Sequence, residues 1–284
     1  MIQRLGSGWM VVAAVFFAIM GALVKWGADY YTSVEMVFYR TIFSVVVLGG
    51  MALFQGQSLK TAHLKQHVSR GVAGTMGILL FFYAITHLPL ATAVTLNYTS
   101  PIFLALLSFF VLKERISRQT IAILVLGFVG VAILLRPSIG GGQFVAGLVG
   151  LSVGVFAGWA YLQVRELALL GEAEWRVVLY FSAVAVVISA ILASIGGWHA
   201  PRNGQDVLLL AGIGLTALVA QMSMTRAYKV GRKFVVASFS YLTVVFSTLL
   251  GVLWFGEILQ WQELVGISVI VLSGILGSVL PLKK

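Results

Sequence analysis

The sequence contains no cysteine and few charged residues. Lys, Arg, Asp and Glu make up 10% of its 284 residues, against roughly a quarter in an ordinary soluble domain. The missing cysteines exclude disulfides, thiolate metal sites, iron–sulfur clusters and cysteine nucleophiles. Proline is also scarce, with 5 residues, whereas 60% of the residues are hydrophobic and the mean hydropathy is +1.02. This composition excludes a soluble enzyme and indicates an integral membrane protein.

Apolar stretches follow one another along nearly the whole chain. Each is about 20 residues long, which is the length that an α-helix needs to cross a bilayer core. We therefore predict an all-α membrane protein with ten transmembrane helices, joined by connections too short to form a soluble domain. The predicted spans are 7–27, 33–54, 68–87, 90–112, 118–136, 144–166, 175–195, 206–228, 234–256 and 262–280.

If the chain crosses the membrane ten times, its basic residues are unevenly distributed between the two membrane faces. The face with both termini holds fifteen Lys and Arg residues, the opposite face holds three, and Arg40 lies within a span. The fifteen are Arg4, Lys60, Lys65, Arg70, Lys113, Arg115, Arg118, Arg165, Arg176, Arg226, Lys229, Arg232, Lys233, Lys283 and Lys284. This asymmetry predicts cytoplasmic N- and C-termini, with residues 7–27 as a retained helix. Basic loops also account for the net charge of +10, so we expect membrane lipid and not nucleic acid as a partner.

The chain contains an internal repeat. Residues 83–135 align without a gap to residues 226–278 at an offset of 143 residues. Identities on this diagonal are Ala84/Ala227, Tyr98/Tyr241, Phe103/Phe246, Leu106/Leu249, Leu107/Leu250, Glu114/Glu257 and Gln119/Gln262. Because five spans per copy is an odd number, the second copy enters the membrane from the opposite side. We predict two inverted five-helix repeats, 1–137 and 144–284, with a substrate site between them near the bilayer midplane. The alternative is two halves that share descent but have no transport function.

The repeated segment also resembles a known family. The stretch FYAITHLPLATAVTLNYTSPIFLALLSFFVLKERISRQTIAILVLGFVGVAIL resembles the EamA-type unit of the drug/metabolite transporter superfamily, and residues 226–276 fit the pattern less strictly. Lys25 and Arg40 stand where that family usually carries a Lys and an Arg. The resemblance implies a ten-helix carrier of small organic solutes such as amino acids or amines, which such carriers often move outward. Val244 replaces Pro101 and Ile258 replaces Arg115 in the copy, so we expect the halves to differ in function.

The fourth span is unusually polar for a membrane helix. It contains Thr95, Asn97 and Tyr98 followed by Pro101, and at the repeat offset the ninth span carries Ser238 and Tyr241. Pro101 has no N–H to donate to the carbonyl of residue 97, so we predict a hinge there. Hydroxyl and phenol pairs on two symmetric helices are expected to line opposite walls of a central cavity. The alternative is interhelical packing through Ser and Thr, which is common in membranes.

Further cavity residues are expected on three other spans. Trp159 and Gln163 lie inside the sixth span, and the repeat offset places them opposite Phe16 and Met20 of the first. Gln221 lies inside the eighth span. Aromatic walls with a few polar groups are typical of pockets for amphipathic metabolites.

Ionisable residues within membrane spans indicate function, because burial of a charge is costly. Arg40 is the deepest, with Glu35 nearby, and its role as an ion-pair partner or as a gate stays open. Lys25 lies close to the same membrane face. Glu114 and Glu257 end the fourth and ninth spans, where they would cap or position the following helix or lock a gate. No embedded acidic pair resembles a proton relay, so proton coupling, exchange and facilitated diffusion stay open.

Motifs for enzymatic chemistry are missing from the sequence. It has no Walker A loop, no His-Glu-x-x-His motif and no Gly-x-Ser-x-Gly elbow, so we expect no catalytic residue, metal or cofactor. A channel would carry polar stripes along whole helices. We conclude that the sequence predicts a monomeric secondary transporter of small organic metabolites in a bacterial inner membrane, working as an exporter. The alternatives are an importer or exchanger of a metabolite or vitamin, and an intramembrane enzyme.

Overall fold

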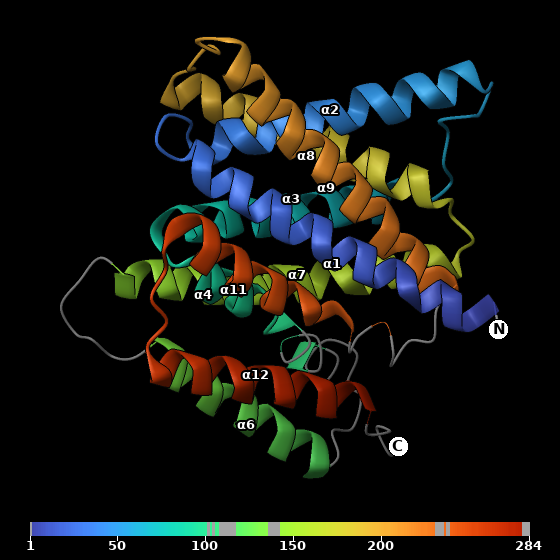
Figure 1. The fold of residues 1–284 in the computed structure, drawn as a ribbon. Helices are drawn as coiled ribbons and strands as arrows, with labels where there is room; N and C mark the ends of the chain where they lie inside the picture. Colours follow the sequence, from blue (N-terminus) through green and yellow to red (C-terminus); the bar gives the residue numbers. More distant parts are fainter. Residues whose placement is uncertain are drawn as a thin grey trace.

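The computed structural model describes residues 2–100, 103, 106–107, 118–135, 143–230, 236 and 239–279. These residues form ten α-helices and no β-strand (Figure 1). The helices are α1 (Ile2–Gly27), α2 (Ser33–Phe54), α3 (Leu64–His87), α4 (Leu90–Asn97), α6 (Arg118–Leu135), α7 (Gln143–Leu169), α8 (Glu174–Gly196), α9 (Gly204–Val230), α11 (Leu242–Phe255) and α12 (Trp261–Val279). Eight of them match a predicted span to within five residues at each end.

Among the described residues, six helices are long and apolar enough to cross a membrane, namely α1, α2, α3, α7, α8 and α9. Their outward faces carry large apolar side chains such as Phe54, Ile195 and Leu208, which are exposed, whereas Thr75, Thr95 and Ser189 are buried inside the bundle. An apolar exterior around a partly polar interior is the distribution expected when lipid surrounds the bundle. The described helices therefore indicate a multi-pass membrane protein.

Two of the predicted spans are interrupted instead of continuous. Helix α4 ends at Asn97, and the chain turns through Tyr98 and Thr99 before Ser100 is helical again. The chain turns again at Tyr241, directly before α11. Pro101 itself lies outside the described residues. Since the second break occurs where the copy has Val244 instead of proline, a proline cannot be its cause.

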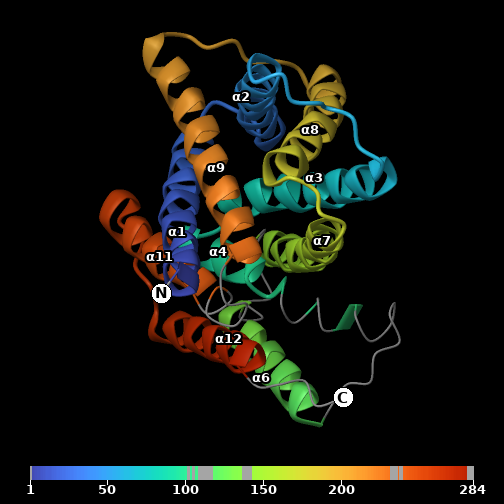
Figure 2. The same cartoon turned by 90° about the vertical axis from the view of Figure 1, so that its right-hand side faces the viewer.

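Helices from the first half of the chain pack mainly on helices from the second half. The most extensive contacts join α3 to α7, α1 to α9, α6 to α12 and α2 to α8. Helices α6 and α12 lie together at one end of the molecule in both views, away from α2 and α8 (Figures 1 and 2). The described helices of the two halves are therefore interleaved.

Glycines allow the closest of these approaches. A Cβ on Gly71 of α3 would lie 2.7 Å from the Cβ of Val184 on α8. On α7, a Cβ on Gly150 would lie 2.8 Å from Leu96 Cδ1 of α4. Small residues at such positions let helix backbones approach, which is a main source of helix association in membranes.

The close approach of α3 and α8 gives a testable prediction. Gly71→Ala should lower the free energy of unfolding by about 1–3 kcal/mol, because overpacking forces the two helices apart. Gly50→Ala on α2 is the matched control, since nothing lies within 4 Å of a Cβ built there. The midpoints of thermal unfolding in one detergent measure both changes, and equal midpoints for the two variants would contradict the packing argument.

Candidate functional site

A cavity of about 100 Å³ lies between the two halves of the chain. Helices α1, α2, α3 and α4 contribute to its wall from the first half, and α7, α8, α9 and α11 from the second. Its polar lining consists of Arg40, Arg70, Asn97, Tyr98, Tyr161, Gln221 and Thr243, and its apolar lining includes Phe17, Met20, Phe81, Phe181 and Met224. Apolar walls with a few polar groups fit a pocket for a small organic molecule.

Five of the residues predicted from the sequence meet in this cavity. They are Met20, Arg40, Asn97, Tyr98 and Gln221, which come from four different helices or their ends. The Tyr98 hydroxyl donates a hydrogen bond of 2.7 Å to Thr243 Oγ1, which joins the broken end of α4 to the start of α11. The helix break at Tyr98 thus turns a polar side chain toward the opposite half.

Three other predicted residues lie outside the lining, and helix geometry explains two of them. Phe17 lines the cavity and Phe16 does not, because one residue corresponds to about 100° of rotation on an α-helix. On α7 the lining residues are Val153, Ala157, Ala160 and Tyr161. Trp159 is two positions from Ala157 and from Tyr161, on another face, where its Nε1 lies 3.5 Å from Ser69 Oγ of α3. Gln163 is half-buried and likewise absent from the lining.

The predicted hydroxyl and phenol pairs are only partly brought together. The Thr95 hydroxyl is buried and donates to the Ala91 carbonyl of its own helix at 2.7 Å, so it does not reach the cavity. The ring centroid of Tyr241 lies 5.7 Å from that of Tyr98, and its buried hydroxyl has no hydrogen-bond partner among the described residues. Ser238 and Glu114 lie outside the described residues.

The two arginines of the cavity differ from what the sequence indicates. Arg40 does not pair with Glu35, although both belong to α2, because the Glu35 carboxylate faces the loop after α8. Arg70 counts as a basic loop residue in the sequence, yet it lies in the second turn of α3 and lines the cavity. Its guanidinium folds over Gly74, where a Cβ would overlap it. The one available signal was that Arg70 falls inside its own predicted span, 68–87.

Lys25 and Glu257 form an ion pair that joins the two halves. Lys25 Nζ lies 2.6 Å from Glu257 Oε1 and donates to the Leu88 carbonyl at 3.0 Å. The same carboxylate accepts the Leu90 N–H at 2.8 Å, so it caps the first turn of α4 and not that of α12, which follows it in sequence. A Cβ on Gly251 would collide with this carboxylate, so the glycine makes room for it.

A second carboxylate, Glu35, lies at the start of α2. It accepts hydrogen bonds from the Thr32 N–H and hydroxyl, each at 2.8 Å, and from the backbone N–H of His199 in the loop after α8. His199 Nδ1 lies 3.1 Å from both carboxylate oxygens. We name Thr32, Glu35 and His199 the Glu35 cluster.

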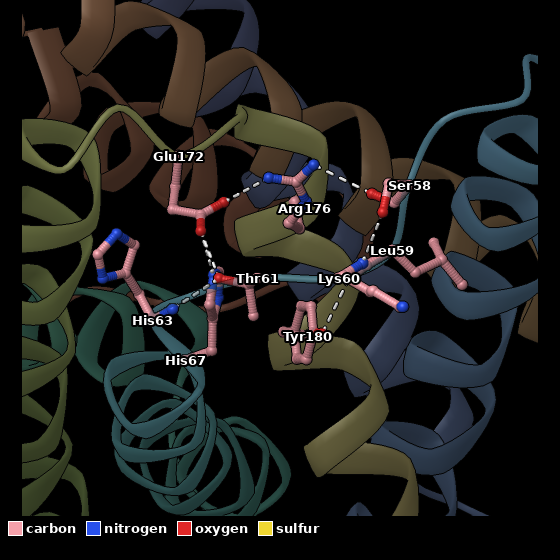
Figure 3. Close-up of polar contacts among 9 residues, drawn as sticks. All are labelled: Ser58, Leu59, Lys60, Thr61, His63, His67, Glu172, Arg176 and Tyr180. Atoms are coloured by element: carbon pink, nitrogen blue, oxygen red, sulfur yellow. Dashed lines mark hydrogen bonds and ion pairs between the residues drawn. The ribbon is translucent and has the colours of Figure 1, made fainter.

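A third carboxylate, Glu172, lies in the connection between α7 and α8 (Figure 3). It accepts hydrogen bonds from Thr61, in the loop before α3, and from Arg176 Nη1 at 2.8 Å. Buried His67 has its Nε2 3.6 Å from the same carboxylate and stacks on Tyr180. Burial raises the pKa of Glu172, but the hydrogen bonds from Thr61 and Arg176 outweigh it and lower the pKa below its ordinary value. We name Thr61, His67, Glu172 and Arg176 the Glu172 cluster.

The Glu35 and Glu172 clusters lie at opposite ends of α2 and α8. Glu35 is near the start of α2, and the loop with Thr61 follows the end of that helix. Glu172 precedes α8, and His199 follows its end. The Arg176 Nη2 group and the Tyr180 hydroxyl also donate to the carbonyls of Ser58 and Leu59, at 3.0 and 2.9 Å, and tie α8 to the loop before α3. Each cluster therefore connects the two halves at one end of the cavity-lining helices.

Within the described part of the chain, no three His, Asp or Glu side chains are grouped as metal ligands would be. The functional groups that the structure brings together are instead two arginines, phenols, amides and hydroxyls around one cavity. Such an arrangement can hold a solute by hydrogen bonds and charge, with aromatic and thioether side chains against its apolar part.

Comparison with known proteins agrees with this description. The model of the EamA-like transporter family matches the chain twice, over residues 4–136 and 144–279. The chain is 31% identical to a pseudopaline exporter of Pseudomonas aeruginosa, over 93% of this chain and 92% of that one. It is 28% identical to a riboflavin transporter of Vibrio cholerae, over 94% and 91%. A solved crystal structure shares the fold with a TM-score of 0.68 over 96% of both chains, at 19% identity. The chain belongs to the EamA-like transporter family and is a membrane transporter, not an enzyme.

Proposed function

We propose that the protein is a secondary transporter that moves small organic metabolites by alternating access. The observation that carries this proposal is the central cavity, which both halves line and whose walls are tied together at opposite ends by the Glu35 and Glu172 clusters. Opening one cluster while the other holds would expose the cavity to one side of the membrane at a time. The halves, 1–137 and 144–284, would rock around the bound solute.

The packing of the helices supports two inverted five-helix repeats. Helix α1 packs on α9 as α7 packs on α3, and α2 packs on α9 as α8 packs on α3. The Glu35 cluster joins the α1–α2 and α8–α9 connections, whereas the Glu172 cluster joins the α7–α8 and α2–α3 connections. The two clusters therefore lie at equivalent places in the two halves and are related by the symmetry of the repeat. With cytoplasmic termini, the Glu172 cluster lies at the cytoplasmic side and the Glu35 cluster at the outer side.

We further propose that the protein works as an exporter in a bacterial inner membrane, as a monomer. The similarity to a pseudopaline exporter supports export of a metabolite. The alternative is import or exchange of a metabolite or vitamin, which the similarity to a riboflavin transporter favours. Flux measured in both directions across proteoliposomes of known orientation separates these alternatives.

Alternating access predicts opposite labelling patterns for variants at the two ends. Because the chain has no cysteine, Ala160→Cys places a single thiol in the cavity lining. Adding Glu172→Gln weakens the cytoplasmic cluster and should raise labelling of this thiol by an impermeant maleimide severalfold from the cytoplasmic side. Adding Glu35→Gln weakens the outer cluster, because it removes the charge that Thr32 and His199 contact, and should raise labelling severalfold from the outer side.

Glu166→Gln is the matched control for both, since Glu166 is exposed on α7 outside the two clusters. Its labelling should equal that of Ala160→Cys alone. Equal labelling from both sides in every background would contradict alternating access, because the cavity would then be open to both sides whichever cluster is weakened.

A neighbouring pair of phenylalanines tests the position of the binding site. Phe17→Ala should raise the KM for a transported solute by about tenfold, because it removes an apolar contact from the cavity wall. Phe16→Ala, one residue along the same helix, should leave KM within about twofold, since its side chain lies outside the lining. Initial rates in proteoliposomes measure both values, and a larger effect of Phe16→Ala would move the site to another face of α1.

A further inference from the structure

The cavity contains two positive charges that no acidic side chain of the described residues neutralises. Arg40 and Arg70 are 3% and 5% exposed, and both line the cavity. Arg40 Nη1, Arg70 Nε and Arg70 Nη1 are buried and have no hydrogen-bond partner in the part of the chain that the structure describes. Over the described ranges, no carboxylate lies within 4 Å of either guanidinium, as an ion pair would require. Buried charges of this kind are costly unless another group pairs with them.

The buried carboxylates of the described residues are all paired, in contrast to these arginines. Glu35 bonds to Thr32 and His199, Glu172 to Thr61 and Arg176, and Asp206 to Arg202. None of these carboxylates belongs to the cavity lining. The bundle thus compensates its negative charges at the helix ends and leaves an excess of positive charge at the cavity.

Aromatic and glycine residues surround the two guanidinium groups at the cavity. The ring of Phe181 contacts both, with its centroid 4.4 Å from Arg70 Cζ and 5.9 Å from Arg40 Cζ. The centroid of the Phe82 ring lies 6.0 Å from Arg40 Cζ. Gly74 leaves the space in which the Arg70 guanidinium lies. Cation–π contacts position a guanidinium without neutralising its charge, so its N–H groups stay available to a ligand.

We propose that the transported solute carries an oxyanion, a carboxylate or a phosphate group, which binds between Arg40 and Arg70. The planar fork of a guanidinium matches both oxyanions, and a group between two arginines supplies the missing negative charge. The amide side chains of Asn97 and Gln221 would meet polar parts of the solute, and Phe17 and Met20 its apolar part. This inference rests on the proposed function, since it assigns a chemical class to the solute of the same cavity.

The test uses probes that share a phenyl ring and differ in the charge of their polar group. Phenylacetate and phenyl phosphate carry the two oxyanions, whereas phenylacetamide is neutral and phenethylamine is cationic. Thermal unfolding of the purified full-length protein is followed with each probe at constant ionic strength. A ligand that binds only the folded state raises the midpoint by mass action. At least one oxyanion should stabilise the protein, with binding about 10- to 100-fold tighter than that of the amide or the amine. A preference between the two oxyanions then shows which group the site takes.

Variants connect the effect to the two arginines. Arg40→Gln and Arg70→Gln should each abolish the stabilisation, whereas Arg40→Lys keeps the charge and should retain part of it. Arg226→Gln is the matched control, because Arg226 is exposed and stacks on Trp9 outside the cavity. If neither oxyanion stabilises more than the amide, or if the stabilisation survives in both glutamine variants, the proposal is overturned.

Proteoliposome flux separates this proposal from the proposed function. Flux of neutral or cationic solutes that is unchanged in both glutamine variants would leave the transporter standing and refute the oxyanion site. If an oxyanion stabilises the wild-type protein but no probe crosses the membrane, the binding site is supported. The same result counts against the proposed transport function.

Discussion

The structure depends on one constraint, which is that an ionised side chain inside a lipid-surrounded bundle needs a partner or a cavity. Glu35, Glu172 and Glu257 meet this constraint with partners from the opposite half of the chain, and so they connect the halves near the ends of their helices. Arg40 and Arg70 meet it differently, since they lie at the cavity. The same constraint therefore separates the ionisable residues into two groups. Those at the helix ends connect the halves, and the two arginines lie at the cavity without an ion-pair partner among the described residues.

Because the two halves are interleaved, these contacts affect how the halves can move relative to each other. Because α1 packs on α9 and α7 packs on α3, neither half can shift without changing contacts made by the other. The breaks at Tyr98 and Tyr241 lie at equivalent positions of the repeat, and Tyr98 bonds across to Thr243. Irregular backbone within a membrane span is tolerated where it borders a cavity or protein. The two breaks thus bring hydroxyl groups of both halves together at one place, which is where an alternating-access carrier needs its solute to bind.

Much of this arrangement could be predicted from the sequence, because apolar length sets the helices and the offset of 143 residues reveals the repeat. Four cavity residues could also be predicted, because they are polar or flexible residues inside apolar spans: Met20, Asn97, Tyr98 and Gln221. The rotation of each helix about its own axis could not be predicted from the sequence. For this reason Phe16 and Trp159 were expected where Phe17 and Tyr161 lie. A membrane helix that is apolar on all faces has no polar stripe to fix its rotation. Arg70 was misjudged because charge near a span end is typical of loops, and only the space above Gly74 shows where its side chain goes.

The central claim is that the two halves move against each other while one end opens and the other stays closed. Thr61 and Glu172 come from different halves and are in direct hydrogen-bond contact, so they offer a site for locking that motion. In the cysteine-free chain, Thr61→Cys together with Glu172→Cys allows a short reducible crosslink across the Glu172 cluster. The most direct measurement is solute flux through proteoliposomes containing the crosslinked protein, before and after reduction. The account predicts that flux stops in the crosslinked state and returns on reduction, whereas undiminished flux through the crosslinked protein would contradict it.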